Sequence, residues 1–152
     1  MASNRHLGRI IALQTLYEYD FRVDCSDGEV KLKEILKRNL VRYEKSLDDK
    51  AFVEDLVAGV LEREKALDEL LQPIAPEWPI DQIARVDRTI LRMAVYELTE
   101  RGDDVPPKVV INEAVELAKA FGSDNSSKFV NGVLGTAYRT LVEGHADADA
   151  KV

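Results

Sequence analysis

The chain has 152 residues, 45% of them hydrophobic, which is enough to bury one substantial core within the usual size of a single domain. Its formal net charge of −7 argues against a protein that coats nucleic acid through bulk charge, because phosphate contacts need local Lys and Arg. A lone cysteine, Cys25, cannot form an internal disulfide, and with two histidines it gives no zinc-type cluster, so we expect an incidental loop thiol and no metal site.

Helical spacing of apolar residues predicts three helices in the first half of the chain, over about residues 3–22, 30–46 and 48–72. Asp48 can cap the third of these, and Pro73 ends it. The apolar stripe of the first helix consists of Leu7, Ile10, Leu13, Tyr17 and Phe21. Such a wide stripe indicates a helix that packs on several neighbours.

The second half opens at Trp78 and contains three further helical segments, over about residues 83–98, 107–121 and 125–143. Pro107 suits the first turn of a helix, since its missing N–H would be unpaired there anyway. These elements predict an all-α fold, a single-domain bundle of about six to seven helices in two packed halves. The domain is expected to cover residues 1–143, with a disordered tail over residues 144–152.

Three glycines carry expectations about packing. Gly122 lies where a helix ends, and we expect a left-handed C-terminal cap there. Gly132 and Gly135 lie inside the final helix, where each costs about 1 kcal/mol relative to Ala. Their presence therefore indicates the close approach of another helix backbone.

The sequence contains no arrangement typical of an enzyme. It has no phosphate-cradling Gly-rich loop and no nucleophile elbow, and His6 and His145 lie in the N-terminal arm and the tail. Most carboxylates occupy the outer faces of predicted helices, where a solvated face is expected. No run reaches the roughly 18 apolar residues of a membrane span, and a signal peptide is lacking, so we expect a cytoplasmic protein that does not bind membranes.

Two arginines at the N-terminus are candidates for nucleic-acid contact. Arg5 and Arg9 are one turn apart and project from the same side of the first helix, so they could straddle adjacent phosphates. The alternative is a solubilising surface pair, although cations are disfavoured near the positive end of a helix dipole. Tyr17 is interpreted equally well as a ring that stacks on single-stranded RNA or as a core residue.

Two segments of the second half have a distinctive amino-acid sequence. Residues 110–122 read VINEAVELAKAFG, and residues 128–134 read KFVNGVL. Together they resemble the signature of the NusB family of bacterial transcription antitermination factors. Residues 5–17 and 85–98 are also similar to that family, so the resemblance covers nearly the whole chain.

The resemblance implies binding of the boxA element of nascent RNA together with NusE, a small-subunit ribosomal protein. It implies no catalysis and no cofactor, but participation in an antitermination complex that keeps RNA polymerase transcribing, notably through ribosomal RNA operons. Asp87 and Arg88 match the region that faces NusE, with an intrahelical pairing as the alternative. The resemblance assigns RNA binding to Arg5, Arg9, Lys128 and Phe129, and the chemistry of the residues themselves adds Tyr17, Asn125 and Ser126 as candidates.

Four polar residues near or within the signature have a structural interpretation as well. Asn125 and Ser126 can cap the final helix or reach RNA, and the residues alone favour capping. Asn112 and Asn131 are expected to be semi-buried and to tie neighbouring helices together.

Two other functions are left open by the sequence. The acidic charge and the few N-terminal arginines fit a NusB-like protein-binding adaptor with weak RNA affinity. NusB-like domains also precede the catalytic domain of ribosomal RNA cytosine methyltransferases, but that domain would need a Gly-rich cofactor-binding unit and a catalytic cysteine, which we do not find. Whether the protein is a monomer or a homodimer is also open.

Overall fold

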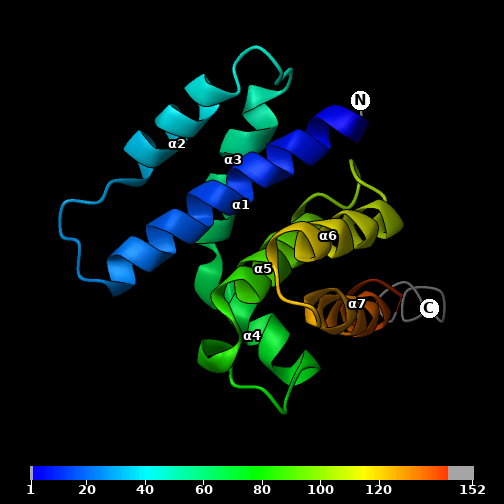
Figure 1. Cartoon of the computed structure of the whole chain (residues 1–152). Coiled ribbons are helices and arrows are strands. Elements are labelled where there is room, and N and C mark those ends of the chain that lie inside the picture. Colours follow the sequence, from blue (N-terminus) through cyan, green and yellow to red (C-terminus); the bar gives the residue numbers. More distant parts are fainter. Residues whose placement is uncertain (1, 144–152) are drawn as a thin grey trace. The chain divides into compact units, whose positions relative to one another are not determined.

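A computed structural model describes residues 2–143 of the chain, and the side chains of residues 5–142, as an all-helical protein without strands (Figure 1). The predicted all-α class is confirmed. The predicted tail, residues 144–152, and His145 lie outside the described residues. The α-helices are α1 (Ala2–Asp24), α2 (Leu32–Arg42), α3 (Lys50–Glu62), α4 (Glu64–Ile74), α5 (Arg85–Glu100), α6 (Pro107–Phe121) and α7 (Ser126–Ala137). A 3-10 turn, η1 (Ile80–Gln82), precedes α5, and a π-helical segment, η2 (Tyr138–Glu143), follows α7.

The chain divides into two compact units, Met1–Leu61 and Glu62–Val152. The sequence placed the start of the second half at Trp78, but α4 belongs with the second unit because it packs against α5 and α7. The predicted helix over residues 48–72 is also two helices, since the backbone at Arg63 leaves the helical region (φ −104°, ψ 11°). No helix within residues 2–143 is long and apolar enough to cross a membrane.

In the first unit, α1 packs against α2 and α3. The predicted stripe of α1 is partly wrong, because Leu13 is buried whereas Phe21 is 47% exposed. Burial extends around the helix instead, since it has neighbours on two sides. The buried apolar residues of α1 are Ile11, Ala12, Leu13 and Leu16, and those of α3 are Phe52, Val53, Leu56, Val57 and Val60.

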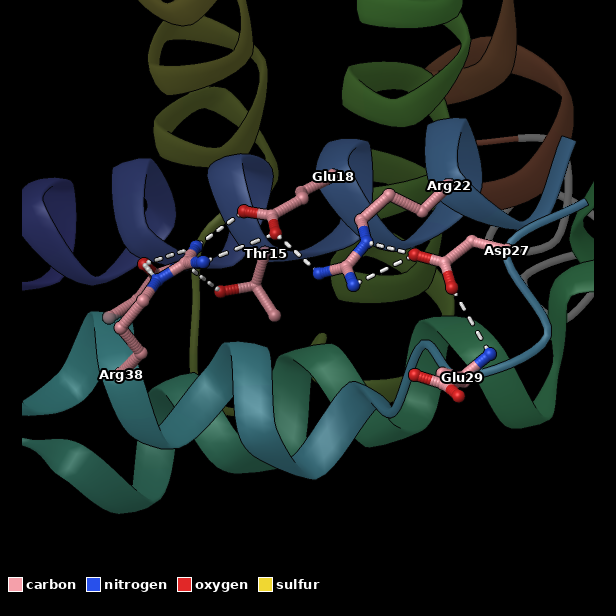
Figure 2. Close-up of polar contacts among 7 residues, drawn as sticks. Thr15, Glu18, Arg22, Asp27, Glu29 and Arg38 are labelled. Atoms are coloured by element: carbon pink, nitrogen blue, oxygen red, sulfur yellow. Dashed lines mark hydrogen bonds and ion pairs between the residues drawn. The ribbon is translucent and has the colours of Figure 1, made fainter. Parts of the chain in front are cut away.

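The side of α1 that faces α2 carries a polar network (Figure 2). Arg38 of α2 donates hydrogen bonds to both carboxylate oxygens of Glu18, with Nη1 3.2 Å from Oε2 and Nη2 bonded to Oε1. Arg22 donates to Glu18 Oε2 at 3.1 Å and to Asp27 Oδ2 at 2.8 Å. The Arg38 hydrogen bonds, followed by those of Arg22, hold the pKa of the Glu18 carboxyl below its usual value. The network therefore joins α2 and the α1–α2 turn to α1.

Buried amide and hydroxyl groups also join the same two helices. Asn39 of α2 is 2% exposed and donates from Nδ2 to Thr15 Oγ1 at 3.0 Å. Thr15 in turn donates to the carbonyl oxygen of Ile11 at 2.8 Å. The helix-tying role expected of Asn112 and Asn131 is wrong for those residues, because both are exposed. A buried asparagine in α2 fills that role in the first unit.

The second unit is built around α5. Every residue of α5 from Thr89 to Leu98 is buried, because α4, α6 and α7 all pack against it. Arg92, 8% exposed, makes a bidentate ion pair with Asp68 of α4, with Nε 2.8 Å from Oδ1 and Nη2 2.8 Å from Oδ2. Its remaining Nη1 lies 2.8 Å from Glu64 Oε1. This charged cluster joins α4 to the central helix.

The glycine expectations for the final helix are wrong. A Cβ added at Gly132 would meet no heavy atom within 4 Å, and at Gly135 it would meet the tip of Arg139 at 3.7 Å. The close approach occurs at Gly8 of α1 instead, where a Cβ would lie 3.1 Å from Phe52 Cδ1 and 3.2 Å from Val53 Cγ2. Gly8 therefore allows α3 to approach the backbone of α1.

Candidate nucleic-acid interface

The N-terminal arginines lie against an aromatic ring of α3. The guanidinium carbon of Arg5 is 4.7 Å from the centroid of Phe52, and that of Arg9 is 5.2 Å from it. Cation–π contacts of this kind stabilise by about 0.5–2 kcal/mol, more when the cation is desolvated. Because Gly8 brings Phe52 close to α1, the ring is within reach of both side chains.

The two arginines differ in exposure. Arg9 is 2% exposed, so the expectation that both arginines lie on the surface is wrong for Arg9. Arg5 retains 26% of its side-chain surface, and its Nη2 lies 3.8 Å from Asp49 Oδ2. Asp49, not the predicted Asp48, also caps α3, since its Oδ1 accepts the backbone N–H of Phe52 at 3.1 Å. In this conformation Arg5 is the arginine of the pair that a phosphate can reach.

Tyr17 lies further along α1, in a half-buried position. Its ring stacks on that of Phe21, with centroids 6.4 Å apart and planes 8° from parallel. The partner ring is 47% exposed. Both interpretations of Tyr17 therefore stay predictions, since the ring is neither a fully buried core residue nor a free surface residue.

In the second unit a cavity of about 220 Å³ brings together residues distant in sequence. The N-terminal turn of α5 contributes Asp87, and the start of α7 contributes Phe129. The α6–α7 turn contributes Ser123 and Asn125, and an exposed indole, Trp78, lies before η1. Four of the predicted site residues line this cavity, namely Asn125, Ser126 and Phe129 from the RNA-binding set and Asp87 from the NusE set.

Asp87 is the most distinctive group of the cavity. It is 7% exposed, and its Oδ1 is buried without a hydrogen-bond partner. An unpaired buried acceptor costs about 1–3 kcal/mol, so a donor that reached this oxygen would recover the cost. Its neighbour Arg88 donates from Nη1 to the carbonyl oxygen of Ile80 at 3.4 Å, which ties α5 to η1.

The α6–α7 turn is held by Ser126. This residue is 2% exposed, and its Oγ accepts the backbone N–H of Ser123 at 2.9 Å. Gly122 is required by the same contact, because a Cβ there would lie 2.4 Å from Ser126 Oγ. The expected left-handed cap is wrong, since φ of Gly122 is −92° and a short steric approach explains the glycine instead. Ser126 therefore positions the turn from within.

The remaining candidates lie at the N-terminal end of α7. Asn125 is exposed at the N-cap position, but its side chain makes no capping hydrogen bond, so the favoured capping interpretation is wrong for it. Lys128 is exposed in the first turn of α7, and Phe129 is half-buried. An exposed ammonium suits a phosphate, and a ring at a cavity wall suits a base.

Sequence reasoning missed Trp78 and Ser123 as members of this cavity. Trp78 is 53% exposed, which is unusual for the largest aromatic side chain, and it lies between two prolines at positions 76 and 79. That setting was a usable signal for a recognition residue. Ser123 gave no such signal, because its place follows from the fold of the turn.

The predicted residues are thus distributed over both units. Arg5, Arg9 and Tyr17 belong to the first unit, and the residues of the cavity, with Lys128, belong to the second. No group of three or more His, Cys, Asp or Glu side chains suited to a metal ion occurs among the described residues. The candidate residues supply aromatic rings, a carboxylate oxygen without a hydrogen-bond partner, and exposed cations. Groups of these kinds bind polar ligands.

Comparison with known proteins gives a consistent result. A family model described as NusB family matches residues 6–139. The transcription antitermination protein NusB of Chloroflexus aggregans is 44% identical over 151 residues, covering 98% of this chain and 97% of that protein. The protein of the same name from Dehalococcoides mccartyi is 37% identical over 143 residues, with 94% and 95% coverage.

Solved structures agree with the sequence comparison. T. maritima NusB matches with a TM-score of 0.74 and 34% identity, over 86% of this chain and 87% of that one. A crystal structure of antitermination factors NusB and NusE in complex with dsRNA matches with a TM-score of 0.76 and 26% identity, over 92% and 99% of the two chains.

Proposed function

We propose that this chain, which belongs to the NusB family, is a transcription antitermination factor that binds boxA RNA together with NusE. Curated relatives that it matches over nearly their full length are named transcription antitermination protein NusB, and a similar solved structure contains NusB, NusE and dsRNA. The protein would support processive transcription of ribosomal RNA operons by RNA polymerase. It would act in the cytoplasm by binding alone, without a catalytic step or a cofactor.

We propose that the RNA site lies at the cavity of the second unit, on the basis of the residues that line it. Phe129 and Trp78 offer ring faces for a base, and stacking of one base contributes about 1–3 kcal/mol. Asp87 Oδ1 can accept a hydrogen bond from an exocyclic amine of a base or from a cationic side chain of the protein partner. Lys128, exposed in the same helix as Phe129, can contact a phosphate.

The role of the N-terminal arginines changes with their environment. Arg5 is the phosphate contact that we propose for the first unit. Arg9 stays a predicted RNA contact, but its guanidinium would have to leave the ring of Phe52 and its buried position. This observation favours a second candidate, an adaptor whose own RNA affinity is weak and rises when NusE is bound.

RNA binding is tested by anisotropy of a labelled single-stranded boxA oligonucleotide. Lys128→Ala should weaken binding and flatten the slope of log affinity against log salt by about 0.7, whereas Lys119→Ala, an exposed lysine of α6, should change neither. Phe129→Leu should lose about five- to 150-fold in affinity through lost stacking. Wild-type affinity in both Lys128→Ala and Phe129→Leu would remove this cavity from the RNA site.

The partner surface is tested by titrating NusE into the protein with and without RNA. Asp87→Asn removes the charge but keeps the shape, and Asp81→Asn, at an exposed position of η1, is its matched control. If Asp87 meets a cation of NusE, Asp87→Asn weakens NusE binding and lowers RNA affinity mainly when NusE is present. An unchanged NusE affinity would remove Asp87 from that interface. RNA affinity that stays undetectable until NusE is added would support the adaptor.

A further inference from the structure

A second hollow lies in the first unit, between α2 and α3, among the residues not assigned to RNA or NusE. Its volume is about 580 Å³. The apolar residues that line it are Leu32, Leu36, Leu40, Val41, Leu47 and Ala58. We call this hollow the α2–α3 groove.

Helix α2 has two faces with different surroundings. One face meets α1 through Ile35, Asn39 and the Arg38–Glu18 hydrogen bonds. The groove side carries a second apolar ridge, because Leu32, Leu36 and Leu40 recur every four residues and so lie in one row along the helix. Val41, beside this row, is 60% exposed. Leu40 is buried, but Leu32 and Leu36 are only half-buried, so packing within the unit leaves part of this ridge exposed beside Val41. An exposed apolar patch of this kind marks an interaction site.

Three lysines and two glutamates, Glu44 and Glu54, line the groove beside its apolar residues. Lys33 and Lys37 line the groove from α2, and Lys50 lines it from the first turn of α3. None of these three ammonium groups forms an ion pair with another residue of the described chain. Residues 31–45 contain six Lys and Arg against two Glu, although the whole chain has 21 basic and 28 acidic residues. The groove lining itself has three lysines against Glu44 and Glu54, so the excess of positive charge is one and lies on the α2 side.

We propose that the α2–α3 groove binds an amphipathic helix with acidic flanks, contributed by a partner protein. A helix laid in a groove inserts apolar anchors at positions i, i+4 and i+7, which span about 10 Å. The ridge from Leu32 to Val41 is about 14 Å long at the helical rise, so it accepts such a set of anchors. Acidic side chains on the flanks would meet Lys33 and Lys37 on one wall and Lys50 on the other.

The charge pattern also sets the register of the bound helix. Lys50, Glu54 and Ala58 follow one another along the same face of α3. The partner therefore needs a carboxylate opposite Lys50 and a neutral or basic residue opposite Glu54, one turn further on. An RNA backbone would use the lysines but gain nothing from the apolar floor, which is why the groove favours a protein.

The proposal is tested with a labelled 18-residue peptide that carries Leu at i, i+4 and i+7 and Glu on both flanks, against a scrambled peptide of equal composition. The acidic amphipathic peptide should bind the full-length protein more tightly than the scrambled one in an anisotropy titration. Lys37→Glu should weaken binding by about three- to tenfold, and Arg42→Glu, on α2 but outside the groove, should have less than a twofold effect. Val41→Glu should weaken binding by about tenfold or more, with Val109→Glu on α6 as its control.

Several results would overturn the proposal. Equal binding of the two peptides would show that the groove does not select an amphipathic helix, and equal effects of Lys37→Glu and Arg42→Glu would reduce the interaction to diffuse charge. A homodimer in sedimentation analysis that Val41→Glu dissociates would make the occupant a second copy of this chain. Weaker boxA binding in Lys37→Glu would assign the groove to RNA instead. Unchanged boxA binding alongside weakened peptide binding supports the groove independently of the RNA site.

Discussion

Replacing Glu18 with Gln tests whether the ionic network of Figure 2 holds α2 to α1. The substitution keeps the side-chain shape but removes the negative charge of the Glu18 carboxylate, whose oxygens accept hydrogen bonds from Arg38 and Arg22. A bidentate pair between Arg and a carboxylate lies at the upper end of surface ion pairs, about 1 kcal/mol, because the Arg38 side chain is 47% exposed. The Arg22 pair, at i and i+4, adds little, because the Arg22 guanidinium is exposed to solvent. We therefore expect a loss of about 1 kcal/mol in the free energy of unfolding at pH 7.

The pH dependence follows from the direction of the Glu18 pKa. Hydrogen bonds from Arg38, then Arg22, lower the pKa of this carboxyl in the folded protein, so its stabilising effect is complete above the unfolded pKa of about 4.3. The effect is lost as the pH falls through the lower folded pKa. The difference between wild type and Glu18→Gln should therefore shrink as the pH is lowered below about 4.3. Asp27, whose pKa is lowered chiefly by Arg22, makes both proteins sensitive to acid.

The measurement is urea unfolding followed by circular dichroism at pH 7 and at several lower pH values. Glu29→Gln is the matched control, because Glu29 is exposed and contributes its backbone N–H, not its carboxylate, to Asp27 Oδ1 (Figure 2). It should change the free energy of unfolding by less than about 0.5 kcal/mol. A Glu18→Gln deficit equal to that of the control, or one that stays constant into the acid range, would refute the ionic account.

The other predictions concern packing, and the same unfolding assay measures them. Gly132→Ala should stabilise the protein by about 1 kcal/mol, because the position is exposed, helical and free of neighbours within 4 Å; a loss of stability would reveal a packed partner there. Gly8→Val should destabilise by about 1–3 kcal/mol, since a Cβ would lie 3.1 Å from Phe52, and a neutral result would show that α3 can move away. Arg92→Ala should cost about 1–3 kcal/mol by leaving Asp68 without its bidentate partner, and wild-type stability would contradict that role.

Local pattern was sufficient for much of the fold. The period of apolar residues predicted helices over most of their observed lengths, because the hydrogen bonds and side-chain neighbours of a helix lie within four residues. Pro107 at the first turn of α6 was predicted for the same local reason. The break at Arg63 was missed, since the apolar stripe continues from α3 into α4 and no Gly or Pro marks the change.

The family resemblance also came from the sequence, and with it the expected partners. It could assign residues to a site but not describe their surroundings. Arg9 illustrates the difference: its spacing from Arg5 was readable, but its burial depends on Phe52, more than forty residues away. Gly122 was recognised as important, but for a backbone conformation that it does not adopt, because the contact with Ser126 is steric.

The sequence by itself determined the helical class, the approximate positions of the helices and the family. These depend on the local periodicity of apolar residues and on the sequence motifs of short segments. The tertiary structure decided which of these residues meet. The packing of α5 and α7 and the turn before α7 place Asp87, Trp78 and Phe129 around one cavity, although these residues span more than fifty positions. Burial, unpaired acceptors and grooves arise from contacts between distant segments, and no local pattern specifies such contacts.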